Sequence, residues 1–424
     1  MARLIIQGGR RLSGTLVPGG NKNAVLPMLA ASLLTDEPVV LKRVPRIADV
    51  RVMLDLLARL GAEVREEGDQ VSVCARGVRR SRLPPELCRR LRASILFAGP
   101  LCVRLGRATL APPGGDVIGR RRLDTHFLGL QALGVSIQGS KDYQFRAERL
   151  RGADILLDEA SVTATEHIVM AACRAEGRTV LFNAACEPHV QALCRMLQAM
   201  GARISGIGTN RLEIEGVPEL KGVEWTVPPD FVEIGSYVAA AAITGGELTV
   251  EGVSEDDLRP IALTYAKLGA RFTVEGDTLR LPARRRLRVM HDFGYAVPRI
   301  EDGVWPSFPT DLMSVAVVMA VRAHGTVLFF EKLYESRLYF VDRLIEMGAR
   351  IVQCDPHRVV VVGPSTLHGL HLNSPDIRAG MGLILAALCA RGTSIVENAQ
   401  VVDRGYERIE EKLRALGAEI GREE

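Results

Sequence analysis

The chain has 424 residues, of which 47% are hydrophobic, 25% charged and 5% aromatic, a balance that excludes a disordered or fibrous protein. Its length predicts two domains of about 200 residues each. The net charge of +4 is small, and because arginine supplies most of the basic residues, it favours small anions over broad nucleic-acid coating.

The N-terminus, MARLIIQGGRRL, predicts a short strand and a turn and lacks the features of a secretory signal. No apolar run approaches the length that spans a membrane. The eight cysteines are scattered, without a CxxC pair or a Cys/His spacing that binds zinc. We therefore expect a cytoplasmic protein in a reducing compartment, with no metal site.

One short word recurs along the chain, in which Leu-Gly or Met-Gly is followed by an apolar stretch. Its glycines are Gly61, Gly134, Gly201, Gly269, Gly348 and Gly417. Intervals of about 70 residues indicate a repeated supersecondary unit. Each word follows a segment with helical apolar spacing, such as residues 49–62, and glycine suits the position that ends a helix. A strand pair often follows the word, as in residues 202–217.

A second helical segment, rich in small apolar residues, precedes each amphipathic one and leads into a β-rich strand. In chain order these segments are residues 23–41, 92–110, 165–182, 232–250, 311–330 and 377–396. Because the helices in them are apolar nearly all round, we expect them to be buried, with the amphipathic helices partly exposed. Six such units predict two domains of three, divided near the paired prolines of residues 226–235.

Residues 75–92 form the most basic run, and they lack the interleaved aromatic residues that stack on bases. This run indicates a solvated face more than a nucleic-acid surface. Residues 111–126, APPGGDVIGRRRLDTH, contain two glycines that allow a mobile or closely approaching backbone, followed by three arginines suited to phosphate or carboxylate. A solvated turn is the alternative for this loop, which carries the lone carboxylate Asp116.

Polar residues gather at two places in the unit. At the starts of the expected buried helices lie Lys22, Asn23, Arg92, Ser161, Thr163, Asp230, Glu233, Asp311, Asp376 and Arg378. In the loops before the amphipathic helices lie Arg46, Arg120, Arg121, Arg122, Asp124, His126, Glu187, His189, Arg337, Asp403 and Arg404. Cations at a helix start create a site for phosphate or carboxylate. Capping explains the acids and hydroxyls equally well, whereas Lys22, Arg92 and Arg378 oppose the helix dipole unless an anion or an acid compensates.

These motifs give the chain a resemblance, over its whole length, to the UDP-N-acetylglucosamine 1-carboxyvinyltransferase (enolpyruvyl transferase) family. The resemblance rests on residues 19–27 (GGNKNAVLP), 91–101 (LRASILFAGPL), 113–119 (PGGDVIG), 204–209 (ISGIGT), 308–312 (FPTDL), 376–380 (DIRAG) and 403–418. It implies an α/β protein of two inside-out domains, each of three repeats, with the active site in the interdomain cleft. Residues 1–21 and 230–424 would form one domain, and residues 22–229 the other, with a mobile catalytic loop around 112–122.

The implied reaction moves the enolpyruvyl group of phosphoenolpyruvate to the 3′-hydroxyl of UDP-N-acetylglucosamine and releases phosphate, the first committed step of peptidoglycan synthesis, without a cofactor. It needs a proton delivered to the methylene carbon, a proton removed from the hydroxyl, and cations that hold phosphate and carboxylate. The resemblance implies catalytic roles for Lys22, Asp116 and Asp311, the last as general base. The expected substrate-binding residues are Asn23, Arg92, Arg121, Asp124, Ser161, Val162, Arg337, Arg378 and Arg404.

Asp116 stands where the family's loop commonly carries the cysteine that the epoxide fosfomycin alkylates, although some members carry aspartate. A carboxylic acid can deliver a proton from the same place, provided that enough of it stays protonated. The resemblance thus implies an Asp-for-Cys loop variant that is insensitive to fosfomycin. We expect small-molecule substrates and no nucleic acid, membrane or obligate protein partner.

Four residues depart from the family's pattern. Phe231 and Cys186 stand where arginine is usual, Arg122 stands where proline is usual, and Trp305 lies in a divergent stretch before Asp311. These departures leave open a paralogue that acts on another nucleotide sugar, or a catalytically silent one that only binds it.

Two further enzyme readings are alternatives. One is a transferase that acts on shikimate 3-phosphate, although the loop and the C-terminal motif fit the nucleotide-sugar branch better. The other is an RNA-end-processing enzyme, which would need a nucleophilic histidine. His126 and His189 are the only histidines in candidate loops, and a hydrogen-bonded histidine at a helix start or at the surface is the simpler account of each.

Overall fold

A computed structural model describes residues 2–116, 118–139, 141–284 and 286–424. The chain divides into two compact units. Unit 1 comprises Met1–Gly19, Val117–Arg120 and Pro229–Glu424, and unit 2 comprises Gly20–Asp116 and Arg121–Pro228. Each unit has a hydrophobic core of its own.

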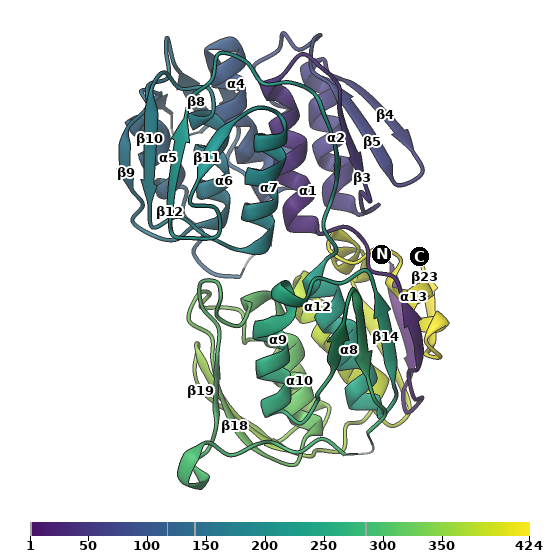
Figure 1. The fold of residues 1–424 in the computed structure, drawn as a ribbon. Helices are drawn as coiled ribbons and strands as arrows, with labels where there is room; N and C mark the ends of the chain where they lie inside the picture. The colour runs from purple at the N-terminus through teal and green to yellow at the C-terminus, as the bar shows by residue number, and fades with distance from the viewer. Residues whose placement is uncertain (1, 117, 140, 285) are drawn as a thin grey trace. The chain divides into compact units, whose positions relative to one another are not determined.

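Unit 2 contains three successive helix, strand, helix and strand-pair arrangements (Figure 1). The first consists of α1 (Lys22–Ala31), η1 (Ser32–Leu34), β3 (Val39–Lys42), α2 (Ala48–Leu60), β4 (Glu63–Glu67) and β5 (Gln70–Cys74). The second consists of α3 (Pro85–Cys88), η2 (Arg92–Phe97), α4 (Ala98–Leu105), β6 (Arg107–Leu110), α5 (Asp124–Ala132), β7 (Ser136–Gln138) and β8 (Tyr143–Arg146). The third consists of β9 (Asp154–Leu156), α6 (Val162–Ala172), β10 (Arg178–Phe182), α7 (Pro188–Ala199), β11 (Arg203–Ser205) and β12 (Arg211–Glu215), and β13 (Val223–Thr226) follows it.

Unit 1 repeats the same arrangement after two N-terminal strands, β1 (Arg3–Gln7) and β2 (Gly14–Leu16). Its first copy consists of α8 (Phe231–Thr244), β14 (Leu248–Glu251), α9 (Glu255–Lys267), β15 (Thr273–Glu275) and β16 (Thr278–Leu281), followed by η3 (Phe293–Tyr295). Its second consists of β17 (Arg299–Glu301), η4 (Thr310–Leu312), α10 (Met313–Arg322), β18 (Gly325–Phe330), α11 (Val341–Glu346), β19 (Ile351–Asp355) and β20 (Arg358–Gly363). Its third consists of β21 (His371–Asn373), α12 (Ile377–Cys389), β22 (Thr393–Glu397), η5 (Ala399–Arg404), α13 (Ile409–Ala415) and β23 (Glu419–Glu423).

The described strands form six small sheets with one common plan. In five of them a short edge strand runs parallel to the strand that follows a buried helix: β13 with β3, β9 with β10, β2 with β14, β17 with β18 and β21 with β22. In the remaining sheet, β6 and β7 each pair antiparallel with β8, and a parallel bridge between Arg82 and Thr109 takes the place of the edge strand. The sheet that contains β21 and β22 also includes the N-terminal strand β1, which pairs antiparallel with both β22 and β23.

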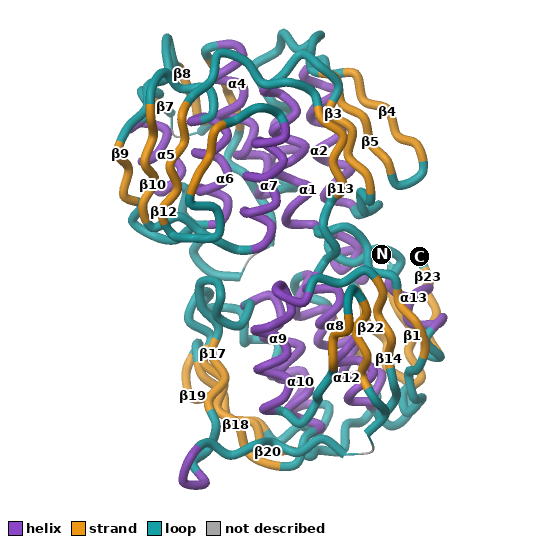
Figure 2. Tube along the Cα trace, viewed as in Figure 1, coloured by secondary structure: helices purple, strands orange, loops and turns teal. Residues whose placement is uncertain are grey.

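The helices rich in small apolar residues form the interior of each unit, as the sequence predicted. Every residue of α12 except the last is buried, and α8, α10 and α12 contact one another in unit 1. In unit 2, α6 contacts both α1 and α4. Figure 2 shows that within each unit the helices lie between strands at the surface. This inside-out α/β fold was expected, and the structure confirms it.

The recurring glycines end helices in the left-handed conformation. Their φ angles lie between +90° at Gly269 and +108° at Gly348, a region that residues with a Cβ rarely adopt. Among the helices of the described ranges, none has the length and apolar character needed to cross a membrane.

Candidate active site

The expected site residues fall into two sets, one in each unit. Unit 2 carries Lys22, Asn23, Arg92, Asp116, Arg121, Asp124, Ser161 and Val162, and unit 1 carries Asp311, Arg337, Arg378 and Arg404. In both sets the side chains extend from helix starts or from the loops before helices, where unsatisfied backbone N–H groups are available.

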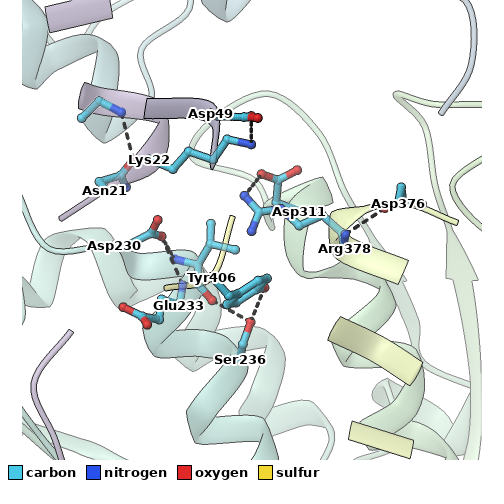
Figure 3. A network of polar contacts seen from close by, with 12 residues as sticks. Asn21, Lys22, Asp49, Asp230, Glu233, Ser236, Asp311, Asp376, Arg378 and Tyr406 are labelled. Atoms are coloured by element: carbon cyan, nitrogen blue, oxygen red, sulfur yellow. Dashed lines mark hydrogen bonds and ion pairs between the residues drawn. The ribbon is translucent and has the colours of Figure 1, made fainter. Parts of the chain in front are cut away.

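Lys22 is the first residue of α1, and Asn21 caps that helix by accepting a hydrogen bond from the N–H of Ala24. The Lys22 ammonium is buried, and its Nζ lies 2.8 Å from Oδ2 of Asp49, in the first turn of α2 (Figure 3). The acid compensates for a cation that would otherwise oppose the helix dipole. The burial of Lys22 therefore does not by itself require a bound anion. Asn23 is half-buried on the same helix.

Arg92 begins a 3₁₀ turn, η2, that runs into α4, where the sequence had indicated a single helix. Its Nη2 donates a 2.7 Å hydrogen bond to the carbonyl of Arg122, so it holds the arginine run that contains Arg121. The loop before Asp116 packs against the same segment. A Cβ on Gly114 would lie only 1.7 Å from the carbonyl oxygen of Arg89. Only glycine allows this close approach, which fixes the backbone that leads to Asp116.

The start of α6 confirms the capping explanation for one expected ligand. Ser161 is the N-cap and accepts a 3.4 Å hydrogen bond from the N–H of Ala164, and Val162 is the first helical residue. Thr163 does not cap; its Oγ1 lies 3.1 Å from Nε2 of the buried His126. Asp124 is exposed at the first position of α5.

The two histidines considered for nucleophilic chemistry are both buried. Nδ1 of His126 lies 3.1 Å from Nδ1 of His167, and Nε2 of His167 accepts a 2.6 Å hydrogen bond from the N–H of Gly99. Burial, and then the neighbouring His167, lowers the pKa of His126 well below its usual value. His189 is 4% exposed. These positions support a structural role and give no support to RNA-end processing.

Asp311 is the centre of the set in unit 1. It lies in η4, a 3₁₀ turn before α10, and its two carboxylate oxygens contact two arginines. Oδ1 lies 3.2 Å from Nη2 of Arg337. Oδ2 lies 2.7 Å from Nη2 of Arg378, and Figure 3 shows these two residues. The arginine side chains are 3% and 6% exposed and that of Asp311 is 24% exposed. Asp311 is therefore not a helix cap but the accessible member of a buried ion-pair cluster.

The two guanidinium groups keep their charge and retain unused hydrogen-bonding capacity. Burial, the largest single effect, opposes the charge of each, but the combined attraction of Asp311 and other neighbouring groups outweighs it and raises the pKa of both Arg337 and Arg378. Among the described residues, Nε of Arg337 and Nη1 of Arg378 have no hydrogen-bond partner. Such buried, unused donors suit a carboxylate or phosphate group of a ligand.

Besides Asp311, two neighbours hold Arg378. Asp376 caps α12 by accepting from the N–H groups of Arg378 and Ala379, at 2.8 and 3.0 Å. The guanidinium of Arg378 lies over the ring of Tyr406, 5.5 Å from its centroid. The hydroxyl of Tyr406 in turn lies 2.9 Å from Oγ of Ser236 on α8 (Figure 3).

Arg404, half-buried at the end of η5, lies next to an ion-pair cluster that the sequence analysis missed. From the C-terminal strand β23, Arg422 contacts Asp403 at 2.7 and 2.9 Å and Glu410 at 2.8 and 3.0 Å. This guanidinium joins both ends of the segment that contains Arg404. The contact links residues far apart in sequence, so no local pattern indicates it.

Residues 118–120 pack against the turn before Arg337. The N–H of Ser336 donates to the carbonyl of Ile118 at 3.2 Å, and the N–H of Arg120 donates to Oε2 of Glu335 at 3.2 Å. Backbone hydrogen bonds, from its own N–H and then from that of Arg120, lower the pKa of Glu335. The sequence analysis did not single out Glu335, which holds the part of the loop that follows Asp116.

The departures from the family pattern have distinct environments. Phe231, the first residue of α8, is buried, and its ring centroid lies 6.0 Å from that of Trp305. Asp230 caps this helix through the N–H groups of Val232 and Glu233. Burial, followed by the charge of Glu187, raises the pKa of the Cys186 thiol. An aromatic pair and a protonated thiol thus occupy the two positions where the resemblance implied arginine.

In the described ranges, no group of three or more His, Cys, Asp or Glu side chains is placed to hold a metal ion. A family model described as EPSP synthase (3-phosphoshikimate 1-carboxyvinyltransferase) matches residues 6–413, which defines the class of the protein as a carboxyvinyl transferase.

Relatives with full-length matches narrow this class. A protein of Treponema denticola named UDP-N-acetylglucosamine 1-carboxyvinyltransferase is 51% identical over 421 residues, 99% of each chain. One of the same name from Bradyrhizobium diazoefficiens is 51% identical over 419 residues, 99% of this chain and 97% of the relative. The chain belongs to the UDP-N-acetylglucosamine 1-carboxyvinyltransferase family.

Solved structures agree with this assignment at the level of the fold. The enolpyruvyl transferase NikO from Streptomyces tendae superimposes with a TM-score of 0.88 at 25% identity, over 99% of this chain and 98% of that one. An EPSP synthase from Acinetobacter baumannii gives a TM-score of 0.78 at 18% identity over the full length of both chains, which shows the common fold alone.

Proposed function

We propose that the protein transfers the enolpyruvyl group of phosphoenolpyruvate to the 3′-hydroxyl of UDP-N-acetylglucosamine and releases phosphate, the first committed step of peptidoglycan synthesis. The observation that carries this proposal is 51% identity, along nearly the whole chain, to relatives named for that reaction. The sequence placed the protein in the cytoplasm without an obligate protein partner, and both remain part of the proposal.

In unit 1, Asp311 is the general base that takes the proton of the acceptor hydroxyl. Its support is geometric: the carboxylate is the accessible group of its cluster, and two arginines fix its orientation. The unused Nη1 of Arg378 binds the carboxylate of phosphoenolpyruvate. Arg337 and Arg404 bind further anionic oxygens of the substrates.

In unit 2, Lys22, Arg92 and Arg121 bind the phosphate of phosphoenolpyruvate. Lys22 also supplies a point charge at the place where the oxocarbenium and the leaving phosphate develop in the transition state. Asn23 binds the acceptor. The nucleotide is bound by Asp124 together with the start of α6 at Ser161 and Val162, whose N–H groups suit an anion. No step needs a metal or an organic cofactor.

Asp116 is the acid that protonates the methylene carbon of phosphoenolpyruvate. It follows a backbone fixed against the Arg89–Arg92 segment, and the residues after it are bound by the turn at Glu335. Because a carboxylate is a poorer nucleophile than a thiolate, we expect no covalent reaction with fosfomycin. The catalytic loop around 112–122 moves during turnover. The two domains are formed by residues 1–21 together with 230–424, and by residues 22–229.

The test is phosphate release from phosphoenolpyruvate with UDP-N-acetylglucosamine as acceptor, with product mass as a second readout. We expect turnover by the wild type and by Asp116→Cys, and about 100-fold or greater loss in Asp116→Ala. Phosphoenolpyruvate binding without turnover would contradict this acceptor. Screening of other nucleotide sugars against wild type and Phe231→Arg would then test the paralogue alternative.

A further inference from the structure

Two carboxyl groups lie buried in unit 1 at equivalent ends of adjacent strands. Asp302 directly follows β17 and is 1% exposed, and Glu331 directly follows β18 and is 0% exposed. The two strands are parallel, with Glu301 paired to Phe330, so the next residue of each lies at the same edge of the sheet. Neither acid touches solvent, and the mechanism above uses neither of them.

Each acid is attached to a segment that carries a proposed site residue. Oε1 of Glu331 accepts hydrogen bonds from the N–H groups of Leu333 and Tyr334, at 3.2 and 3.1 Å, in the turn that leads to Arg337. The hydroxyl of Thr310, the residue before Asp311, lies 3.0 Å from both carboxylate oxygens of Glu331.

Only one of the two carboxylate oxygens of Asp302 has a hydrogen-bond partner among the described residues. Its Oδ1 accepts a 2.6 Å hydrogen bond from the N–H of Lys332. Its Oδ2 is buried and has no hydrogen-bond donor among the described residues. An ionised oxygen in that position loses its hydration without compensation. A proton shared with the carboxyl group of Glu331 removes this deficit and also the repulsion between two neighbouring carboxylates.

Other charges near the pair favour a single proton. Arg337 is the cation that faces Glu331, and it also contacts Asp311. The Lys332 ammonium is paired instead with Glu301, at 2.8 Å, and Asp376 caps α12. His357 meets Glu331 through the backbone carbonyl, 2.6 Å from its Nδ1. With Arg337 already shared with Asp311, two ionised carboxylates behind it would leave buried negative charge uncompensated. Burial, and then Asp302, raises the pKa of Glu331 to about 9.

We propose that Asp302 and Glu331 share one proton and act as a positioning pair, which holds the Thr310–Asp311 turn and Arg337 in the geometry that the general base requires. The part that concerns catalysis rests on the proposed function of Asp311. Loss of the shared proton at alkaline pH leaves two carboxylates that repel each other, so the turn loses its support and turnover falls. The groups themselves do not touch substrate.

The free energy of unfolding should depend on pH through the same proton. The pKa of Glu331 is raised from 4.5 in a free chain to about 9 in the folded protein. Between these values the folded state binds more protons than the unfolded state, so this group makes stability fall as pH rises through the window. Glu331→Gln keeps a neutral side chain with an N–H donor for Asp302 and removes that contribution.

The first experiment is infrared spectroscopy of the wild type at pH 7, which detects a protonated carboxyl group without any enzyme activity. We expect a carboxylic acid C=O component that is lost in Glu331→Gln and unchanged in Glu301→Gln. Burial, and then Glu187, also raises the pKa of Glu166, so the component from that acid should remain in both variants. Glu301 is the matched control because it is the same residue type one position before Asp302, in an ion pair with Lys332. A Glu331→Gln spectrum with the same carboxylic acid absorption as the wild type would overturn the shared proton.

The second experiment is the pH profile of kcat and KM from pH 6 to pH 10. One pH unit above a pKa of about 9, about one tenth of the pair retains its proton, so wild-type kcat at pH 10 should be about tenfold below its plateau. In Glu331→Gln this alkaline decline should disappear, with kcat at pH 7 within about threefold of wild type and KM little changed. An identical decline in wild type and variant would overturn the positioning role.

A third variant keeps the test decisive if Glu331→Gln fails to fold. Asp302→Asn gives Glu331 an amide donor in place of the shared proton, so the alkaline decline should again disappear. If the infrared band is present but UDP-N-acetylglucosamine is not turned over, the shared proton stands and the proposed function fails. The two conclusions are therefore separable.

Discussion

Oδ2 of Asp311 lies 2.7 Å from Nη2 of Arg378, so the acid before α10 and the arginine at the start of α12 form an ion pair. The arginine side chain is 6% exposed and that of the acid is 24% exposed. The carboxylate is thus the member of the pair that solvent or substrate can reach. Its orientation is fixed before any substrate binds, which is what a general base needs.

Asp311→Asn should abolish most turnover without unfolding the protein. The amide has the shape of the acid and still accepts a hydrogen bond from Arg378, but it cannot take the hydroxyl proton. We expect kcat to fall about 100- to 10,000-fold, with a change of less than about tenfold in phosphoenolpyruvate affinity measured by calorimetry. Asp256→Asn, at an exposed ion pair on α9, is the control. A change in affinity alone would contradict the role as base.

Asp49→Asn should destabilise the protein by about 3 kcal/mol, because it leaves the buried Lys22 ammonium without its acid at a helix start. Adding Lys22→Met should restore most of that stability, since neither charge then remains. The double variant should be inactive, because it lacks the Lys22 ammonium. Urea unfolding of the two single variants and the double variant measures the coupling, and simply additive losses would argue against the ion pair.

Asp116→Cys should make the protein sensitive to fosfomycin. The thiolate opens the epoxide, whereas the carboxylate of the wild type does not. We expect time-dependent inactivation and a covalent adduct in the mass spectrum for the variant, and neither for the wild type. A wild-type adduct at any residue would show that insensitivity does not follow from the loop acid.

Gly119→Ala should lower kcat/KM by disturbing the contact between the loop and Glu335. A Cβ there would lie 2.2 Å from Oε2 of Glu335, and φ is +134°. Gly201→Ala is the matched control, because Gly201 has a φ of +105° and no atom within 4 Å of the added Cβ. We expect a loss of about 10-fold or more at Gly119 and little change at Gly201. Equal losses would point to backbone strain instead of the contact.

Much of the fold was predictable because its signals are local. Apolar helices of small residues, glycines that end helices and the caps at Ser161 and Asp230 all depend on neighbours within a few residues. The same signals placed Lys22, Arg92 and Arg378 at helix starts, and Arg121, Arg337 and Arg404 in the loops before helices. The 3₁₀ turns at Arg92 and Asp311 were not distinguished from α-helix, since apolar spacing cannot resolve a single first turn.

The partners of the site residues were not predictable. Asp49, Glu335 and Arg422 act through contacts between segments far apart in the sequence, and a lone acid or arginine has no pattern that indicates its partner. Lys22 and Arg378 were expected to need an anion or an acid, and the structure provides acids for both. Their positions at helix starts are therefore compatible with catalysis but do not prove it.

Because β1 pairs with β22 and β23, part of unit 1 can fold only late during synthesis on the ribosome. Unit 2 ends at Pro228, so its core residues have all been made before most of unit 1 exists. The last sheet of unit 1 must wait, because β1 is among the first strands made and both of its partners are among the last. Removal of residues 419–424 deletes β23 and should leave one edge of β1 unpaired. We expect unit 1 to lose stability, while unit 2 still unfolds cooperatively. Until β22 and β23 have been made, β1 has no partner strand in this sheet.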